Sequence, residues 1–189
     1  PVVIATGSTS GPPLAPTAAP AGVVTAAAVL DAARAERLDE VVPAGDVVVL
    51  DPIGGPIGVS IAELLAPQGR TVKFVTGDHF AGQLLSLTGD LAPSNVRLAH
   101  LGVEIVARSV VRAIGVDTVT VEQRFSGERR ELSGTVIDAG PRLPDEALWL
   151  ESGERHPRAG DAVAPRTIHE AILEARRAVA DLDRVGVVA

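Results

Sequence analysis

Residues 46–66, D-V-V-V-L-D-P-I-G-G-P-I-G-V-S-I-A-E-L-L-A, constrain the fold more than any other stretch of the chain. Residues 46–50 predict a buried strand, because the run is apolar after its first residue and mostly β-branched. From Val59 onward the apolar residues recur with helical spacing. Gly54, Gly55 and Gly58 lie between the strand and the helix. Such a unit places free backbone N–H groups at the positive end of a helix, which is typical of a diphosphate site.

The glycine pattern matches a dinucleotide-binding turn only in part. Gly55 and Gly58 fit the second and third glycines of G-x-G-x-x-G, whereas Ile53 stands at the first. An acidic residue that holds the ribose hydroxyls is expected at the end of the next strand, about 20 residues on. Thr76 occupies that place, with Asp78 two residues later, and Thr76 offers neither an acid nor a charge for a 2′-phosphate. The predicted cofactor-binding residues of this turn are Gly54, Gly55, Pro56, Ile57, Gly58 and Thr76. The alternative is a βαβ unit whose glycines serve packing alone.

Composition is compatible with this interpretation and excludes several others. The chain has 189 residues, 46% of them hydrophobic and 2% aromatic, so Val, Ala, Leu and Ile must build the core. That choice suits helices lying on a β-branched parallel sheet. The net charge of −7 and the absence of a basic run argue against nucleic-acid binding.

The residue types that are missing narrow the chemistry further. The chain has no cysteine, which excludes disulfides, thiol catalysis and an iron–sulfur cluster held by this chain. The four histidines show no metal-ligand spacing, so no metal site is expected. No apolar stretch reaches membrane-spanning length and no leader pattern is present, so we expect no membrane contact and a cytoplasmic location. Because the chain begins at Pro1 and contains no Met, it is expected to be part of a longer polypeptide.

The remaining chain predicts further elements around the central unit. Residues 8–22 contain four prolines and predict an extended crossover. Thr25 and Ser94 are expected to cap helices. Strands are expected at residues 1–7, 103–107, 109–114, 118–124, 130–132 and 135–139, those between 109 and 132 being antiparallel. Helices are expected at residues 26–38, 95–101 and 165–183, the last burying Ile168, Ala171, Ile172, Ala175 and Val179.

Four motifs in order resemble one family of flavoenzymes. They are I-A-T-G at 4–7, the central glycine unit, V-I-D-A-G-P-R at 136–142, and G-D-A-V-A-P-R-T-I-H-E-A-I-L-E-A at 160–175. In this order the chain is similar to the C-terminal half of the trimethylamine dehydrogenase and 2,4-dienoyl-CoA reductase branch of the old-yellow-enzyme (NADH:flavin oxidoreductase) family. The resemblance covers essentially the whole chain.

The resemblance implies an α/β fold: a Rossmann-like parallel sheet with an antiparallel three-stranded crossover, inserted in part of a second FAD/NAD(P)-binding domain. In this family a barrel with FMN and an iron–sulfur cluster precedes an outer domain for FAD or ADP and an inserted domain for NAD(P)H. By resemblance, residues 1–14 and 135–189 belong to the outer domain and residues 15–134 to the inserted one. The barrel and the outer domain's first glycine loop are absent, so this chain alone is expected to be inactive, with FMN and the iron–sulfur cluster confined to the missing parts.

The resemblance also implies further site residues. Gly160 and Asp161 would face the ribityl and diphosphate groups of FAD, and Thr6 and Gly7 would pass its adenosine. In the turn that begins at Gly140, Arg142 would approach a phosphate or ribose in the inserted site. Each residue also has a simpler interpretation. For Asp161 it is an acidic residue that is favourable near a helix start, and for Thr6 and Gly7 it is a turn at a strand end. For Arg142 it is a surface ion-pair partner.

The sequence thus predicts the nucleotide-binding portion of a flavin-dependent NAD(P)H or amine oxidoreductase, which positions NAD(P)H or ADP for electron transfer with flavin. The remainder of the same enzyme is the expected partner. One alternative is a non-catalytic ADP-binding or structural domain. Another is a module that docks an electron-transfer flavoprotein through its acidic surface.

Overall fold

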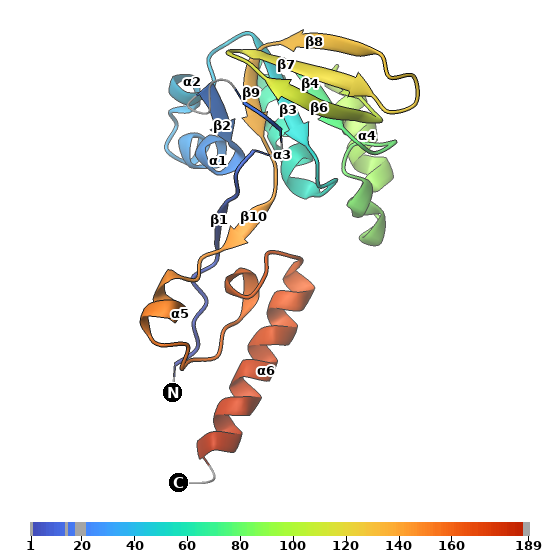
Figure 1. The fold of residues 1–189 in the computed structure, drawn as a ribbon. Helices are drawn as coiled ribbons and strands as arrows, with labels where there is room; N and C mark the ends of the chain where they lie inside the picture. The colour runs from blue at the N-terminus through green and yellow to red at the C-terminus, as the bar shows by residue number, and fades with distance from the viewer. Residues whose placement is uncertain (1, 14, 18–21, 187–189) are drawn as a thin grey trace. The chain divides into compact units, whose positions relative to one another are not determined.

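The computed structural model describes residues 2–13, 15–17 and 22–186 (Figure 1). The chain divides into two compact units, Pro12–Pro141 and Pro1–Gly11 with Arg142–Ala189. The strand at residues 135–138, which the resemblance assigns to the outer domain, pairs with strands of the larger unit.

A five-stranded parallel sheet forms the centre of the larger unit. Its order is β2-β9-β3-β4-β5, and every neighbouring pair is parallel. The strands are β2 (Val23–Thr25), β9 (Thr135–Asp138), β3 (Asp46–Asp51), β4 (Thr71–Thr76) and β5 (Glu104–Val106). With the antiparallel sheet β6 (Ser109–Ile114), β7 (Thr118–Gln123) and β8 (Arg129–Ser133), this arrangement confirms the predicted α/β fold class.

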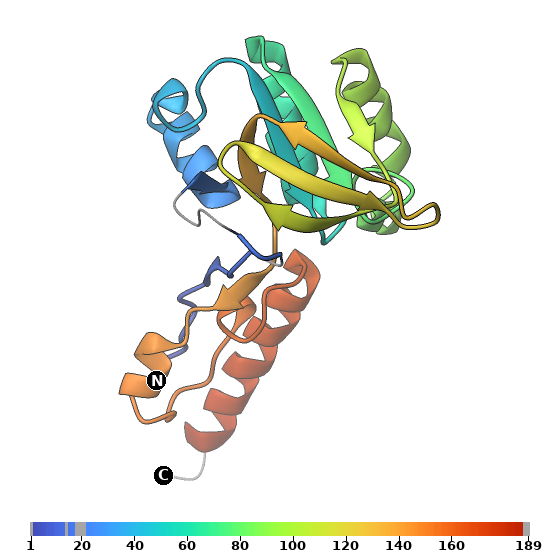
Figure 2. The same cartoon turned by 45° about the horizontal axis from the view of Figure 1, so that its top comes forward.

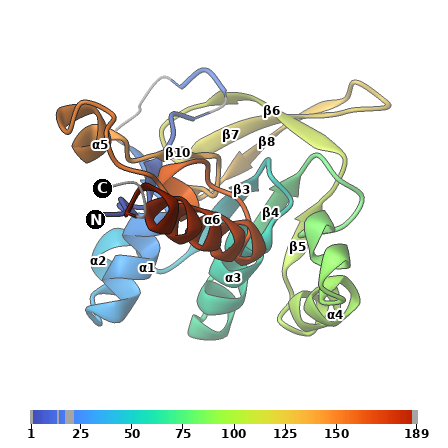
Figure 3. The same cartoon turned by 90° about the horizontal axis from the view of Figure 1, so that it is seen from below.

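Two cores cover the two faces of the parallel sheet. Successive side chains of β3 point to opposite faces, so Val47 and Val49 pack against helices while Val48 and Leu50 pack against the antiparallel strands. Figure 2 and Figure 3 show β6, β7 and β8 on one side of the sheet and helices on the other. The helices of this unit are α1 (Ala26–Arg34), α2 (Leu38–Val41), α3 (Pro56–Leu65) and α4 (Leu91–His100), with 3₁₀ turns η2 (Ala66–Gln68) and η3 (Gln83–Leu87).

The order of the strands reverses between β3 and β9. From β3 the chain continues through α3 to β4 and then β5 on one side, whereas β9 and β2 lie on the other. Leu50 on β3 pairs with Asp138 on β9, so the carboxyl ends of these strands are adjacent. In open α/β sheets, ligands bind outside the carboxyl ends at such a switch point.

The structure confirms some predicted helix starts and corrects others. The Thr25 hydroxyl accepts a hydrogen bond from Ala28 N at 3.2 Å and caps α1. The central helix begins at Pro56, earlier than Val59, because proline suits the first helical position. The prediction that Ser94 caps a helix is wrong: α4 already begins at Leu91, and the Ser94 hydroxyl donates back to the Leu91 carbonyl at 3.0 Å.

The smaller unit contains a strand pair and the last helix. β1 (Ser8–Ser10) pairs antiparallel with β10 (Arg142–Pro144), followed by α5 (Ala147–Glu151), η4 (Gly160–Ala162) and α6 (Ile168–Gly186). The predicted strand at residues 1–7 is wrong for its described residues, since Ile4 makes only an isolated bridge to Arg158. Gly7, with φ of +86°, turns the chain before the paired segment begins.

The predicted buried face of α6 is wrong for four of its five residues, all except Ala171. Ile168, Ile172 and Val179 are 79%, 51% and 53% exposed, and Ala175 is exposed as well. Ala178, which is 4% exposed, packs inward, with Ala171 half-buried on the same side. Helical periodicity identified an apolar stripe but not which of two adjacent stripes meets the rest of the unit. No described helix has the length and apolarity that a membrane crossing requires.

Gly58 allows α3 to pack closely on the sheet. A Cβ at this position would lie 2.9 Å from Asp51 Cβ and 3.2 Å from a ring carbon of Phe74. We expect Gly58→Ala to lower the free energy of unfolding by about 1–3 kcal/mol, because both neighbours are buried in a packed core. Chemical denaturation measures this change. Gly55→Ala is the control, since its Cβ would meet only Ile53 at 3.8 Å; an equal loss in both variants would contradict the packing argument.

Candidate functional site

The candidate site is the turn between β3 and α3, at the carboxyl edge of the parallel sheet. Asp51 ends β3 and is 2% exposed. Its Oδ1 atom accepts a hydrogen bond from Gly54 N at 3.0 Å, whereas Oδ2 is buried without a hydrogen-bond partner among the described residues. Burial raises the pKa of Asp51 to about 6, against the lowering effect of the Gly54 and Ile53 backbone N–H groups.

The start of α3 presents backbone donors at this turn. Gly55 is the N-cap residue, and no side chain of the described chain caps the helix there. Pro56 at the first helical position has no N–H, so Ile57 and Gly58 carry the next N–H groups. These groups have no partner within the helix and lie at its positive end. They can bind an anion, although Asp51 already engages the Gly54 amide.

The loop after β4 folds back over the same turn. Leu84 N donates to the Gly54 carbonyl at 2.8 Å. Gly54 has φ of +72°, and a Cβ there would lie 2.5 Å from Asp78 Oδ2. The Asp78 carboxylate therefore packs directly against the glycine turn. Its negative charge also raises the pKa of Asp51, after the larger effect of burial.

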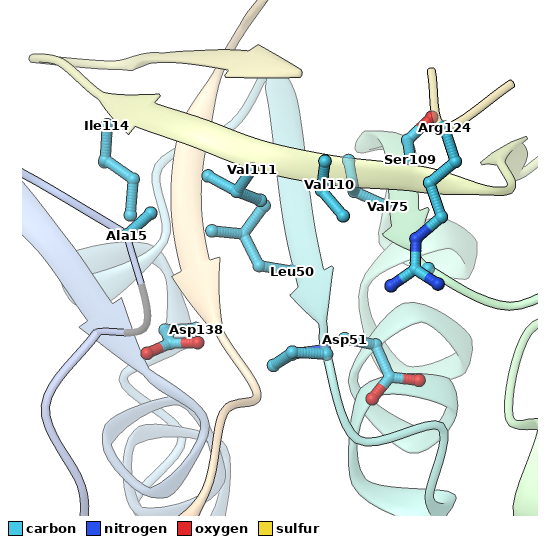
Figure 4. Close-up of a pocket in the computed structure, with 12 residues that line it drawn as sticks. Ala15, Leu50, Asp51, Val75, Ser109, Val110, Val111, Ile114, Arg124 and Asp138 are labelled. Atoms are coloured by element: carbon cyan, nitrogen blue, oxygen red, sulfur yellow. The ribbon is translucent and has the colours of Figure 1, made fainter. Parts of the chain in front are cut away.

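A cleft of about 210 Å³ opens beside the turn, between the parallel sheet and β6 (Figure 4). Its walls are mostly apolar side chains of β3, β4 and β6. Asp51, Asp138 and Arg124 provide its charged groups. The other lining residues are Ala15, Leu50, Pro52, Val75, Gly77, Ser109, Val110, Val111 and Ile114. An apolar cleft with a few charged groups at the switch point is a typical small-molecule site.

The second acid of the cleft, Asp138, ends β9. Burial raises its pKa, and the Gly140 backbone N–H opposes that rise. A Cβ on Gly140 would lie 2.7 Å from Asp138 Oδ1, so the carboxylate packs closely on that glycine. Asp51 and Asp138 thus each end one of two adjacent strands, but Asp138 pairs with Leu50, so the two carboxyls point to opposite faces of the sheet.

Arg124 supplies positive charge at the cleft. Its guanidinium lies against Gly77, where a Cβ would be 2.9 Å from Arg124 Nη2. The side chain is exposed, and within the described parts of the chain no carboxylate forms an ion pair with it. Figure 4 shows its guanidinium pointing toward the end of β3. Arg124 is therefore available to an anionic ligand.

The structure places the predicted site residues in separate groups. Gly54, Gly55, Pro56, Ile57 and Gly58 form the turn, while Thr76 is 1% exposed at the end of β4. Gly140 lies in the larger unit, two residues after the end of β9, against Asp138. Thr6, Gly7, Arg142, Gly160 and Asp161 belong to the smaller unit.

Ser8 connects two predicted residues of the smaller unit. Arg142 donates from Nε to Ser8 Oγ at 2.8 Å and from Nη2 to the Ser8 carbonyl at 2.5 Å. The Ser8 hydroxyl donates to Asp161 Oδ2 at 2.7 Å. Nearby along the chain, the Thr6 hydroxyl donates to the Asp145 carbonyl at 2.6 Å. The Arg142 guanidinium is thus held within the smaller unit.

Sequence reasoning missed Asp51, Asp138 and Arg124. A signal for the two acids was present: each ends a buried apolar strand immediately before a glycine turn, in L-D-P-I-G and I-D-A-G. No comparable signal marked Arg124, because only the return of the antiparallel strands brings it to the cleft. Among the described residues, no group of acids and histidines could hold a metal ion.

Comparison with known proteins relates the fold to oxidoreductases, although no family model matches the chain. N,N-dimethylglycine/sarcosine dehydrogenase of Chromohalobacter salexigens is 27% identical, over 74% of this chain and 25% of the relative. Histamine dehydrogenase from Rhizobium sp. 4-9 is 25% identical with a TM-score of 0.78, covering 93% of this chain and 29% of its own. The 6-hydroxypseudooxynicotine amine oxidase of Pseudomonas geniculata N1 is 22% identical with a TM-score of 0.81. The match covers 93% of this chain and 28% of the oxidase.

A flavoprotein disulfide reductase of Escherichia coli shares the fold at 18% identity, with a TM-score of 0.64 over 95% of this chain and 43% of its own. This chain therefore has the fold of a domain found in flavin-dependent oxidoreductases. It covers 25–29% of the length of the two dehydrogenases and the amine oxidase. That coverage is consistent with one part of a larger enzyme.

The raised pKa of Asp51 predicts a pH-dependent stability. Because the folded chain binds the Asp51 proton more tightly than the unfolded chain, stability falls as pH rises from 3.8 to about 6. A shift of this size costs the folded state roughly 3 kcal/mol. Asp51→Asn keeps an acceptor for Gly54 N but does not ionise. Chemical denaturation at pH values from about 4 to 7 measures the free energy of unfolding of both proteins. We expect the wild type to lose roughly that amount relative to Asp51→Asn over this range. Parallel pH profiles of the two proteins would contradict the prediction.

Proposed function

We propose that this chain is the nucleotide-binding portion of a flavin-dependent oxidoreductase, and that the larger unit positions NAD(P)H or ADP for electron transfer with a flavin. The observation that carries this proposal is the uncapped start of α3, which opens at the carboxyl edge of the sheet beside the cleft. Both features lie at the switch point of the strand order, where α/β sheets bind dinucleotides.

The groups at this edge match the parts of a nucleotide. The N–H groups of Ile57 and Gly58 can bind a diphosphate, and the Arg124 guanidinium adds positive charge. The apolar walls of the cleft can hold a ring system. The nicotinamide of a bound dinucleotide supplies the hydride, and the share of this chain is to bind and orient it.

We assign the remaining cofactors as the resemblance implies. Residues 1–14 and 135–189 would belong to an outer domain for FAD or ADP, with Asp161, Gly160, Thr6 and Gly7 toward the cofactor. FMN and an iron–sulfur cluster would belong to the remainder of the same enzyme, which is the proposed partner. The coverage of only 25–29% of the dehydrogenases and the amine oxidase supports a larger enzyme of the trimethylamine dehydrogenase type.

A second candidate function is a non-catalytic ADP-binding or structural domain. It is favoured by the Asp51 carboxyl, which engages the Gly54 amide and so fills part of the turn with an internal acid. Ile53 at the first glycine position of the motif favours the same alternative. Titration calorimetry of the full chain with NADH, NADPH and ADP separates the two. Binding that requires the nicotinamide supports the oxidoreductase, whereas binding of ADP alone, or none, supports the second candidate.

Gly55→Val tests the turn as the binding site. A Cβ at Gly55 has only Ile53 within 4 Å, at 3.8 Å, so the variant is expected to fold, with its side chain over the approach of the diphosphate. We expect nucleotide binding measured by calorimetry to be abolished. Ser60→Val is the matched control, an exposed position on the same helix that should leave affinity unchanged. Undiminished affinity in a folded Gly55→Val variant would exclude this turn as the site.

A further inference from the structure

The acid that the sequence motif lacks at the end of β4 is supplied two residues later. Thr76 stands at the expected place but is 1% exposed, so its side chain faces the protein and not a ligand. Its hydroxyl oxygen accepts a hydrogen bond from Asp78 N at 3.2 Å. Asp78 O in turn accepts from Arg108 N at 2.8 Å. These bonds fix the backbone of Asp78 on both sides.

The fixed backbone brings the Asp78 carboxylate to the glycine turn. Asp78 Oδ2 lies 2.5 Å from the place where a Cβ on Gly54 would stand, a distance that only a glycine permits. The acid of a dinucleotide-binding unit holds the ribose hydroxyls beside its glycine turn. Asp78 therefore reaches, through a bend in the loop, the place where such an acid acts.

A second acceptor lies at the same turn. Asp51 Oδ2 is buried and has no hydrogen-bond partner within the described chain, although Oδ1 of the same carboxyl is engaged by Gly54 N. An unpaired buried oxygen is costly, and a ligand hydroxyl that donates to it would relieve the cost. Both carboxyls lie at Gly54, because Asp51 Oδ1 accepts from the Gly54 N–H at 3.0 Å and Asp78 Oδ2 lies 2.5 Å from the place of a Gly54 Cβ. Beside these two carboxyls, a ligand group that donates hydrogen bonds is favoured and an additional phosphate is disfavoured, whereas the diphosphate lies over the start of α3.

We propose that Asp78 binds the adenosine ribose of a dinucleotide through its hydroxyls and, with Asp51, excludes a 2′-phosphate, so that the site selects NADH over NADPH. This inference rests on the proposed function of the turn. Asp78 is the specificity-determining residue, and Thr76 positions it.

Arg124 is the feature that could give the opposite preference. Its guanidinium lies against Gly77, next to Asp78 in sequence, and a 2′-phosphate could use it. The side chain is exposed on the antiparallel strands' side of the cleft, whereas Asp78 packs on the turn itself. The structure therefore favours Asp78 as the group nearest the ribose, with Arg124 available to the diphosphate.

Titration calorimetry with NADH and NADPH, which differ only in the 2′-phosphate, tests the proposal on the full chain. We expect NADH to bind at least roughly tenfold more tightly near neutral pH, because a phosphate beside two carboxylates is repelled. Asp78→Asn should bring the two affinities to within about threefold, by weakening NADH and strengthening NADPH. Thr76→Val should also reduce the ratio of NADH affinity to NADPH affinity, because it removes the hydroxyl that holds the Asp78 backbone.

The outcomes separate this inference from the function on which it rests. Equal affinities in the wild type, a preference for NADPH that Arg124→Met removes, or an unchanged ratio in a folded Asp78→Asn variant would each overturn the role of Asp78 while leaving the nucleotide site intact. Failure of both dinucleotides to bind would overturn the proposed function and this inference together. Thermal unfolding followed by circular dichroism establishes that each variant is folded.

Discussion

The close packing of α3 on β3 and β4 is the contact on which the rest of the site depends. Gly58 has no side chain, so the first turn of the helix can lie against Asp51 and Phe74. This contact sets where the helix begins, and Pro56 then fixes its first residue. The backbone donors of the helix consequently open at the carboxyl edge of the sheet, next to the reversal of strand order. A bulkier residue at Gly58 would move the helix start, and the donors with it.

Asp51 determines how strongly that opening can attract an anion. The carboxyl ends a buried strand and engages an amide that a phosphate could otherwise use. A ligand diphosphate must therefore compete with an internal acid whose pKa lies near 6. When Asp51 is protonated its charge no longer opposes the phosphate, and when it is ionised the ligand must provide more favourable contacts elsewhere. The turn is thus a weaker anion site than its glycines alone would suggest.

The parts of the fold that local patterns encode could be predicted, and the parts that depend on distant partners could not. The strand, glycine turn and helix at 46–66 follow from periodicity and glycine placement, and Thr25 was recognisable as a cap. The inward face of α6 and the pairing of residues 8–10 depend on segments far along the chain. In the site, the glycines were visible in the sequence. Asp78 stands two residues beyond the expected place, and the bend at which Asp78 N donates to the Thr76 hydroxyl has no signal in a linear motif.

Two acids pack against glycines along this edge of the sheet. They separate places that repel anions from places that attract them. Asp138 lies on Gly140, and Asp78 lies on Gly54, each at a distance that a Cβ would prevent. Both carboxylates are thereby held close to the backbone, where they can accept hydrogen bonds from a ligand and repel anions. Among the described residues that line the turn and the cleft, the start of α3 and Arg124 provide positive potential. A ligand that fits this distribution carries its phosphates over the helix start and directs hydroxyl or amide donors toward the acids, as a nucleotide with an unmodified ribose does.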